Sequence, residues 1–328
     1  MRQAATDVND PEVAAGPADQ VSADVPATAP GVSVVIATRN RPELLAKAVQ
    51  AALGQDYDGP VEVIAVFDQA EPSPDLARDD EHRSVRVTRN SRTPGLAGAR
   101  NTGLGLARHP VVAFCDDDDF WTPAKLRAQV AAMAATGARA SVTGIRIHYG
   151  TQVRRRTIDA RVLRHDDLVR SRVTAAHPSS YVVERAVAEQ AGPVDEVLPG
   201  GYGEDYDWLL RVSAITDIAC VSEPMVEVLW HPGSYFTRQW DTIEEALGYL
   251  LRKHPDIAAD GRGAARIHGQ QAFALAALGR RRDSWSRLVT TLRENPRERR
   301  AWATMLVLAR VTTADRVLHA ANKVGRGI

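Results

Sequence analysis

Four consecutive carboxylates, Asp116 to Asp119, directly follow an apolar run from Val111 to Cys115. The run has the length and unbroken apolar character of a strand that is covered on both faces in a parallel sheet. Adjacent carboxylates repel one another unless a cation neutralises them, and hard oxygen ligands suit Mg²⁺ or Mn²⁺. Open α/β sheets bind ligands beyond the carboxyl ends of their strands, so this segment predicts a metal and ligand site. The alternative is an acidic turn that caps a helix near Pro123.

Two further segments carry residues that could bind an anion or move a proton. The glycine-rich stretch from Gly95 to Gly103 opens a predicted helix and contains Arg100, so a guanidinium and a helix N-terminus would lie together, and both bind anions. A second glycine-rich loop, Pro199 to Gly203, precedes Glu204 and Asp205 at the start of an acidic helix. A carboxylate beside such a loop can act as a general base, although a lone Glu-Asp pair is usually only a helix start.

The elements that must position these residues alternate between strands and helices. In the first part we expect strands over Val32 to Ile36, Val61 to Phe67, Ser84 to Thr88 and Val111 to Cys115, and helices over Glu43 to Leu53 and from the glycine-rich stretch to Arg108. This order resembles one nucleotide-binding half of a doubly wound sheet, with four strand ends on one side. The sequence therefore predicts an α/β fold with a Rossmann-like sheet flanked by helices.

The second part of the chain continues the α/β pattern and then becomes helical. We expect helices over Lys125 to Thr136, Ala186 to Gly192 and Trp208 to Thr216, and strands over Ala140 to Tyr149, His177 to Val183, Ile218 to Val221 and Val226 to Trp230. The basic triplet Arg154 to Arg156 is placed on a hairpin or loop. Beyond about Trp240 all signals are helical: Thr242 to Lys253, Gly263 to Leu278, Ser284 to Arg293 and Arg299 to Lys323.

Composition divides the chain into three regions. Residues 1–30 are rich in Ala, Pro and Asp and lack large apolar side chains, so we expect a disordered leader. Residues 31–240 are the predicted α/β domain, and residues 241–328 form a separate helical C-terminal region. From Gly261 onward there are 14 Lys or Arg against 4 Asp or Glu. These helices either pack on each other and on the first domain or make a peripheral contact with an anionic membrane, and a homo-oligomer is a further possibility.

The overall composition excludes several classes of protein. Lys plus Arg and Asp plus Glu both total 41, so no net charge favours a nucleic-acid partner. The two cysteines, Cys115 and Cys220, both lie in apolar segments, which favours reduced thiols and a cytoplasmic protein. We expect no signal peptide and no membrane span, because no apolar run approaches the required length. Any membrane contact would therefore be peripheral, on the inner face.

From about Val32 to Tyr235 the chain resembles an inverting glycosyltransferase of the GT-A fold, family 2. The family's first-strand pattern V-S-V-V-I-P-T-Y-N-R stands here as V-S-V-V-I-A-T-R-N-R, with Ala37 and Arg39 in place of Pro and Tyr. Its second strand ends V-D-D-G-S, here V-F-D-Q-A, so Asp68 matches the acid that contacts the base. Its G-x-x-x-A-R-N-x-G matches the segment from Gly95 to Gly103, and its F-L-D-D-D-D matches Phe114 to Asp119.

The resemblance implies roles for individual residues. The nucleotide-sugar would be bound by Ala37, Thr38, Arg39, Asn40, Asp68, Arg100, Asn101, Asp116, Asp117 and Gly201. In the D-x-D pattern Asp116 and Asp118 are the named pair, and Asp118 would be the direct ligand of Mn²⁺ or Mg²⁺, joined by His231 after the last core strand. The Glu-Asp pair matches Glu204 and Asp205; the family pattern favours Asp205 as the catalytic base, with Glu204 as its rival.

The function implied is metal-dependent transfer of a sugar from a nucleoside-diphosphate sugar, with a UDP-sugar favoured, to an acceptor hydroxyl. The acceptor would be a carbohydrate, a lipid-linked molecule or a small molecule, in glycan, cell-envelope or glycosylated metabolite synthesis. Two alternatives remain: a nucleotidyltransferase that acts on sugar phosphates, and an inactive relative that binds nucleotide-sugars or glycans. A nucleotidyltransferase typically has a glycine-rich loop after its first strand, where this chain has T-R-N-R-P.

Overall fold

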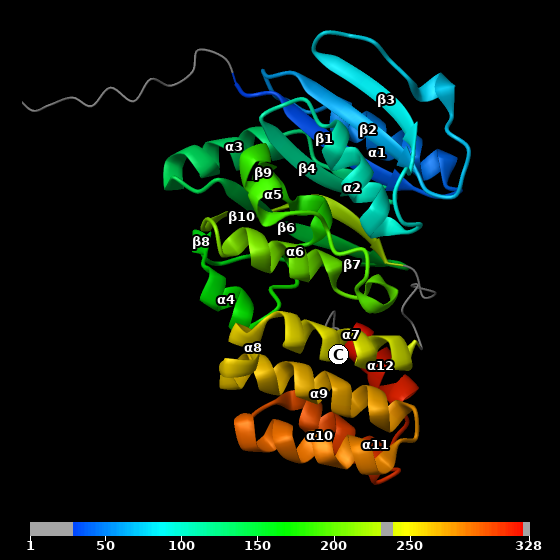
Figure 1. Cartoon of the computed structure of the whole chain (residues 1–328), viewed down its shortest axis with the longest axis vertical. Coiled ribbons are helices and arrows are strands. Elements are labelled where there is room, and N and C mark those ends of the chain that lie inside the picture. Colours follow the sequence, from blue (N-terminus) through cyan, green and yellow to red (C-terminus); the bar gives the residue numbers. More distant parts are fainter. Residues whose placement is uncertain (1–28, 231–238, 324–328) are drawn as a thin grey trace, which may run out of the picture.

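The computed structural model describes residues 29–230 and 239–323, and in them one mixed sheet forms the centre of the α/β part, with the C-terminal helices at the other end of the long axis (Figure 1). The ten strands of this described part follow the order β3-β2-β1-β4-β9-β6-β10-β5, with β7 beside β6 and β8 beside β10. Their bounds are β1 Val32–Thr38, β2 Val61–Phe67, β3 Arg83–Arg89, β4 Val111–Asp116, β5 Asp119–Trp121, β6 Ala140–Tyr149, β7 Gln152–Arg156, β8 Val162–Leu163, β9 Val182–Glu184 and β10 Ile218–Trp230.

The first four strands form a parallel half-sheet, as the sequence predicts. Strand β1 lies between β2 and β4, and β3 pairs with the outer edge of β2. The register places Thr38 beside Phe67 and Ala37 beside Asp116, so three strands end at the same level. Residues 111–115 of β4 are buried on both faces, which explains their unbroken apolar run.

Six helices of the described part cover the two faces of the sheet. They are α1 Pro42–Leu53, α2 Leu96–Leu106, α3 Lys125–Thr136, α4 His165–Arg170, α5 Arg185–Ala191 and α6 Glu204–Ser213. Helices α1 and α3 pack on one face, where Leu45 and Leu126 meet Ile36. Helices α2, α4, α5 and α6 pack on the other, where Phe114 meets Trp208 with ring centroids 5.0 Å apart. Both faces of the sheet are therefore covered by packed helices, which hold the strand ends in place.

Several predicted elements differ from the structure. Strand β5 was not predicted, because it has only three residues, begins with Asp119 and shows no apolar pattern. The strand expected over His177 to Val183 is a short 3-10 turn, Pro178–Ser180, followed by β9. The last two predicted strands are one strand, β10, with an irregular register around Pro224. Helix α6 begins four residues before Trp208, at Glu204.

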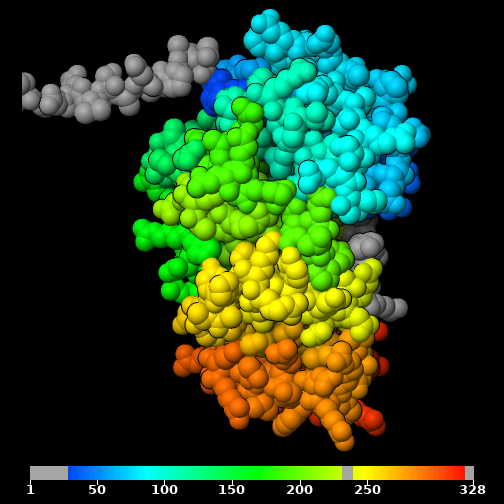
Figure 2. Space-filling model, viewed as in Figure 1, coloured from blue at the N-terminus to red at the C-terminus, as the bar shows by residue number. Residues whose placement is uncertain are grey.

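The C-terminal region is helical, as predicted, and joins the core of the α/β part. Its helices are α7 Trp240–Lys253, α8 Pro255–Ala259, α9 Gly261–Ala277, α10 Arg281–Glu294, α11 Arg299–Leu308 and α12 Ala314–Lys323. Leu247 of α7 and Ile267 of α9 belong to the same hydrophobic cluster as Trp208. Figure 2 shows the yellow surface of α7 and α8 pressed against the green surface of the α/β part. Helices α7 and α9 therefore share a core with the α/β part, and the domain boundary at residue 240 stays a prediction.

A smaller cluster holds the end of the described chain together. Ala272, Leu288, Ala301 and Leu308 connect α9, α10 and α11. The helix predicted from Arg299 to Lys323 is two helices, because Arg310 adopts a left-handed conformation with φ 61° and interrupts it. Within the described residues no helix is both long and apolar enough to cross a membrane.

Candidate functional site

The strand ends of β1, β2 and β4 open into a pocket of about 690 Å³. Nine of the residues selected from the sequence line it: Ala37, Thr38, Arg39, Asp68, Asp116, Asp117, Asp118, Gly201 and Glu204. The opposite wall comes from the start of α2, Gly95 to Gly98, and from the loop that carries Asp195 and Glu196. Residues that are far apart in sequence thus meet at one edge of the sheet, as expected of an open α/β fold.

Three of the four consecutive carboxylates at the end of β4 line the pocket. Thr38 Oγ1 donates to Asp117 Oδ2 at 2.7 Å, and Arg41 Nη1 lies 2.7 Å from Asp118 Oδ2 and 3.2 Å from Asp117 Oδ1. Burial raises the pKa of Asp118, and the neighbouring Asp116 adds to the effect. Burial also raises the pKa of Asp117, against the hydrogen bond from Thr38. The carboxylates at this strand end therefore favour a positive charge beside them, and the guanidinium of Arg41 provides one.

The fourth carboxylate, Asp119, points away from the pocket into the interior. Its side chain is 2% exposed, accepts a hydrogen bond from Ser179 Oγ at 2.5 Å and lies 3.3 Å from His177 Nδ1. Burial, with Asp116 nearby, raises its pKa well above the usual range. Among residues 29–230 and 239–323, Asp116, Asp119 and His177 are the group whose ligand atoms come close enough to share a metal ion. His177 was missed because no spacing links it to the acidic run.

Two of the three predicted metal ligands, Asp116 and Asp118, line the pocket. Asp118 is engaged with Arg41, and Asp116 with Arg100. His231 lies outside the described residues. The assignment of Asp118, Asp116 and His231 to a metal ion stays a prediction, while the structure adds Asp119 and His177 to the residues around Asp116.

Arg100 lies behind the pocket instead of lining it. Its side chain is 3% exposed, and it donates to Asp116 Oδ1 at 2.7 Å and to Glu204 Oε1 at 3.0 Å. It stacks over Phe114 at 5.4 Å from the ring centroid. Both of its partners face the pocket, so Arg100 connects the acidic strand end to the start of α6. The structure gives Arg100 a positioning role for two pocket carboxylates, and its assignment to the nucleotide-sugar stays a prediction.

Glu204 and Asp205, the predicted acid pair, point in different directions. Glu204 lines the pocket, and burial raises its pKa to about 7 although Arg100 opposes this. Asp205 lies outside the pocket lining, and both of its oxygens accept hydrogen bonds from Arg172 Nη2 at 3.0 and 2.9 Å. Burial alone would raise the pKa of Asp205, but Arg172 and Arg100 outweigh burial and lower it. Burial therefore favours the protonated form of Glu204, whereas the two arginines favour the ionised form of Asp205.

Asp68 closes the pocket at the end of β2. Its Oδ1 accepts hydrogen bonds from Asn90 Nδ2 at 2.8 Å and from the backbone N–H of Gly95 at 3.0 Å. Burial would raise its pKa, but these hydrogen bonds lower it. Gly95 has φ 124°, a conformation that favours glycine, and this turn delivers its N–H to the carboxylate. The structure thus ties β2 to the start of α2.

Two predicted binding residues have other positions. Asn101 is buried, donates to the carbonyl of Val194 at 2.8 Å and to Glu196 Oε1 at 2.7 Å, and so holds the loop of the opposite wall. Asn40 adopts φ 55° and is absent from the pocket lining. Their assignment to the nucleotide-sugar stays a prediction; the structure gives Asn101 a positioning role.

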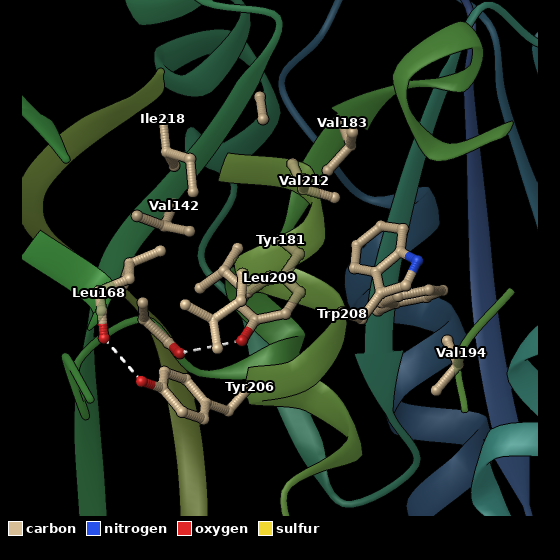
Figure 3. Close-up of a cluster of buried hydrophobic side chains, with 14 of the residues drawn as sticks. Val142, Leu168, Tyr181, Val183, Val194, Tyr206, Trp208, Leu209, Val212 and Ile218 are labelled. Atoms are coloured by element: carbon tan, nitrogen blue, oxygen red, sulfur yellow. Dashed lines mark hydrogen bonds between the residues drawn. The ribbon is translucent and has the colours of Figure 1, made fainter. Parts of the chain in front are cut away.

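Helix α6 is anchored so that its first residues stay at the pocket. Figure 3 shows Trp208, Leu209 and Val212 pointing from α6 into the core, beside Tyr181 and Val183. Tyr206 Oη donates to the carbonyl of Leu168 on α4 at 2.6 Å (Figure 3). The helix therefore cannot rotate without losing both apolar burial and a buried hydrogen bond.

An ion network connects this anchor to the C-terminal helices. Asp207 is fully buried and lies 2.8 Å from Lys253 Nζ and 2.8 Å from His254 Nε2. Lys253 also pairs with Asp195 of the pocket wall, and the side chain of Tyr249 donates to the same carboxylate. Neither Lys253 nor Asp195 carried a functional signal in the sequence. Helix α7 thus supports the wall of the pocket directly.

Residues 33–180 match the family model described as Glycosyl transferase family 2. This segment contains nearly all of β1, all of β2 to β8, and four acidic residues of the pocket lining: Asp68, Asp116, Asp117 and Asp118. Over these residues, just under half of the chain, the sequence is similar to glycosyl transferase family 2. The family 2 segment is 34% identical over 117 residues to the succinoglycan biosynthesis protein ExoO of Rhizobium meliloti (35% of this chain, 33% of that protein).

A second relative names a donor and an acceptor. The Escherichia coli UDP-Glc:alpha-D-GlcNAc-diphosphoundecaprenol beta-1,3-glucosyltransferase WfaP is 31% identical over 100 residues, 30% of this chain and 39% of the relative. The chain thus spans between a third and two fifths of the length of these two curated relatives.

Solved structures show that the fold is of the GT-A type. The S. aureus TarS 1-349 structure in complex with UDP-GlcNAc superposes with a TM-score of 0.60 at 14% identity, over 90% of this chain and 92% of that one. The mannosyltransferase PcManGT from Pyrobaculum calidifontis, in complex with GDP-Man and Mn²⁺, gives 0.51 at 17% identity, over 87% and 81%. The prediction of a GT-A fold with C-terminal helices is confirmed.

Proposed function

We propose that this protein is a metal-dependent inverting glycosyltransferase that moves a sugar from a nucleoside-diphosphate sugar to an acceptor hydroxyl. The observation that carries the proposal is the pocket at the ends of β1, β2 and β4, which brings Asp68, Asp116, Asp118 and Glu204 to one space. A pocket of about 690 Å³ is large enough for a nucleotide-sugar. The family match supports the reaction class, and the names of WfaP and TarS favour a UDP-sugar.

The residues at the strand end fit Mn²⁺ or Mg²⁺. Carboxylate oxygens are the hard ligands that both ions prefer, and burial raises the pKa of Asp117 and Asp118, so a further cation would stabilise their ionised forms. Asp118 and Asp116 would hold the ion, with His231 as the predicted third ligand. A bound ion supplies charge neutralisation for the diphosphate leaving group.

The residues of the chain divide the remaining tasks. Asp68 and Thr38 stand where the nucleoside would bind, at the ends of β2 and β1. Arg100 holds Asp116 and Glu204 in place through its two hydrogen bonds. Asp205 is the proposed base: an inverting transfer needs an ionised carboxylate to take the acceptor proton, the resemblance favours the second acid of the pair, and Arg172 and Arg100 lower the pKa of Asp205. Arg172 would orient the Asp205 carboxylate, and one of its oxygens would also have to accept the proton of the acceptor hydroxyl.

The acceptor class follows from the relatives alone. ExoO is named for succinoglycan biosynthesis, and the name of WfaP gives a GlcNAc-diphosphoundecaprenol acceptor, so we propose a carbohydrate or lipid-linked acceptor in glycan or cell-envelope synthesis. A thermal-shift screen of UDP- and GDP-sugars with Mn²⁺ tests the donor. Stabilisation by one nucleotide family in Mn²⁺, lost after chelation, supports the proposal, and indifference of the melting temperature to every nucleotide contradicts it.

A further inference from the structure

The outer face of α11 carries two large apolar side chains between arginines. Trp302 and Leu306 are four residues apart and therefore lie on one face of the helix, with 58% and 47% of their surfaces exposed. Arg299, three residues before Trp302 on the helix, is also exposed, and so is Arg310, two residues beyond the end of the helix. This outer face, defined as Arg299, Trp302, Leu306 and Arg310, contains no acidic residue.

The face is not needed to hold the helix in place. The opposite side of α11 buries Ala301, Thr304 and Leu308, and two of these belong to the cluster shared with α9 and α10. Val311, just beyond the helix, is 70% exposed. Large apolar side chains that the core does not use, grouped on one helix face, indicate a surface for something else.

The neighbouring helix repeats the pattern at its start. Trp285 of α10 is 57% exposed, and the exposed Arg281 and Arg282 lie one turn before it. Helices α10 and α11 form the end of the molecule that is remote from β2 and β3 (Figures 1 and 2). The aromatic residues and arginines thus occupy one end of the long axis.

The charges make this end strongly positive. Residues 261–328 hold 14 Lys or Arg against 4 Asp or Glu, whereas residues 1–260 hold 27 against 37. Of the four acids, Asp283 is paired with Arg280, Glu294 with His268 and Glu298 with Arg300. The acids are therefore largely neutralised locally, and the field of this end comes from the exposed arginines.

We propose that the outer face of α11, together with the start of α10, docks on an anionic lipid surface. Tryptophan and leucine bury their apolar parts at the headgroup boundary while flanking arginines pair with anionic headgroups, which is the arrangement of an interfacial basic helix. A second copy of the chain would bring two positive faces together, so charge favours lipid over self-association. The proposal does not depend on the proposed sugar transfer.

Vesicle co-sedimentation of the full chain tests this. The protein is expected to bind mixed vesicles of phosphatidylcholine and phosphatidylglycerol at low salt and to be released from them by high salt. It should not bind vesicles of pure phosphatidylcholine. Replacing Trp302→Ser and Leu306→Ser together should lower partitioning at least about tenfold, because both side chains lose their apolar burial. The matched control is Val153→Ser, which replaces a 56% exposed valine on β7, outside the C-terminal helices, and should leave vesicle binding unchanged.

The same samples distinguish the alternatives. Circular dichroism must show that the double variant keeps its helices and its melting temperature. Failure of the wild-type chain to bind anionic vesicles, or equal binding of the double variant, overturns the proposal. So does light scattering that shows a wild-type dimer and a monomeric double variant, since the face would then join two copies.

Discussion

The choice between Asp205 and Glu204 as the base can be made from the pH dependence of the reaction. A base works only when it is deprotonated, so the acid limb of kcat/KM reports its pKa in the free enzyme. Burial raises the pKa of Glu204 to about 7, whereas Arg172 and Arg100 outweigh burial and keep that of Asp205 below its ordinary value. The two candidates therefore predict different profiles between pH 5 and 8.

The size of the difference follows from these values. With a pKa of about 7, only about 3% of Glu204 is ionised at pH 5.5, so a reaction that used it would slow roughly thirtyfold relative to pH 8. A reaction that uses Asp205 stays within a few-fold over the same range, because Asp205 remains ionised. We predict the second behaviour. Removing the ion pair with Arg172→Gln should raise the pKa of Asp205, so that kcat/KM of this variant should fall toward the acid end of the pH range.

The assay is UDP release with the acceptor that gives the highest turnover, followed from pH 5.5 to 8 in Mn²⁺. Asp205→Asn should lower kcat by roughly 10²–10⁴ and leave UDP affinity nearly unchanged, while Glu204→Gln should be milder. An acid limb near pH 7 that disappears in Glu204→Gln would exchange the two roles. If both variants keep near-normal turnover, neither carboxylate is the base.

Three further changes test other parts of the structure. Asp118→Asn should weaken UDP binding in Mn²⁺ by at least about a power of ten; equal affinity with and without metal in calorimetry contradicts this. Lys253→Met should lower the free energy of unfolding by about 1–3 kcal/mol and raise the donor KM, because Asp195 of the pocket wall and the buried Asp207 both lose the Lys253 ammonium, while the exposed Lys47→Met should change neither. Lys125 is fully buried and its ammonium has no hydrogen-bond partner among the described residues, so burial lowers its pKa to about 7. The unfolded chain then binds more protons above pH 7, and wild-type stability should rise by about 2 kcal/mol from pH 7 to 9 in urea titrations, a gain that Lys125→Met should lack.

The parallel half of the sheet could be predicted because its signals are local. Strand β4 is a continuous apolar run up to Asp116, and β2 is apolar except for Glu62 and is followed by Asp68, so both strands end where the pattern placed them. Helix α3 ends at Gly137, whose φ of 72° is the left-handed cap that glycine favours. Each of these elements is specified by residues within a few positions of one another.

The rest of the site depends on contacts that sequence spacing does not encode. His177 meets Asp119 only because the turn before β9 packs under the end of β4. Arg172 reaches Asp205 from a segment without strand or helix periodicity. Lys253 braces the pocket wall from a helix that the sequence assigned to a separate region. Such long-range pairs form after the layers pack, so a reading of one segment at a time misses them.

Turnover of nucleotide-sugars is the measurement that tests the central claim most directly. The full chain, incubated with UDP-glucose or UDP-N-acetylglucosamine, Mn²⁺ and a panel of carbohydrate and lipid-linked acceptors, should release UDP and yield a glycoside with inverted configuration at the anomeric carbon. Chelation should stop the reaction. Binding of a nucleotide-sugar without any transfer, or transfer that is equally fast in the Asp205→Asn, Glu204→Gln double variant, would contradict the account.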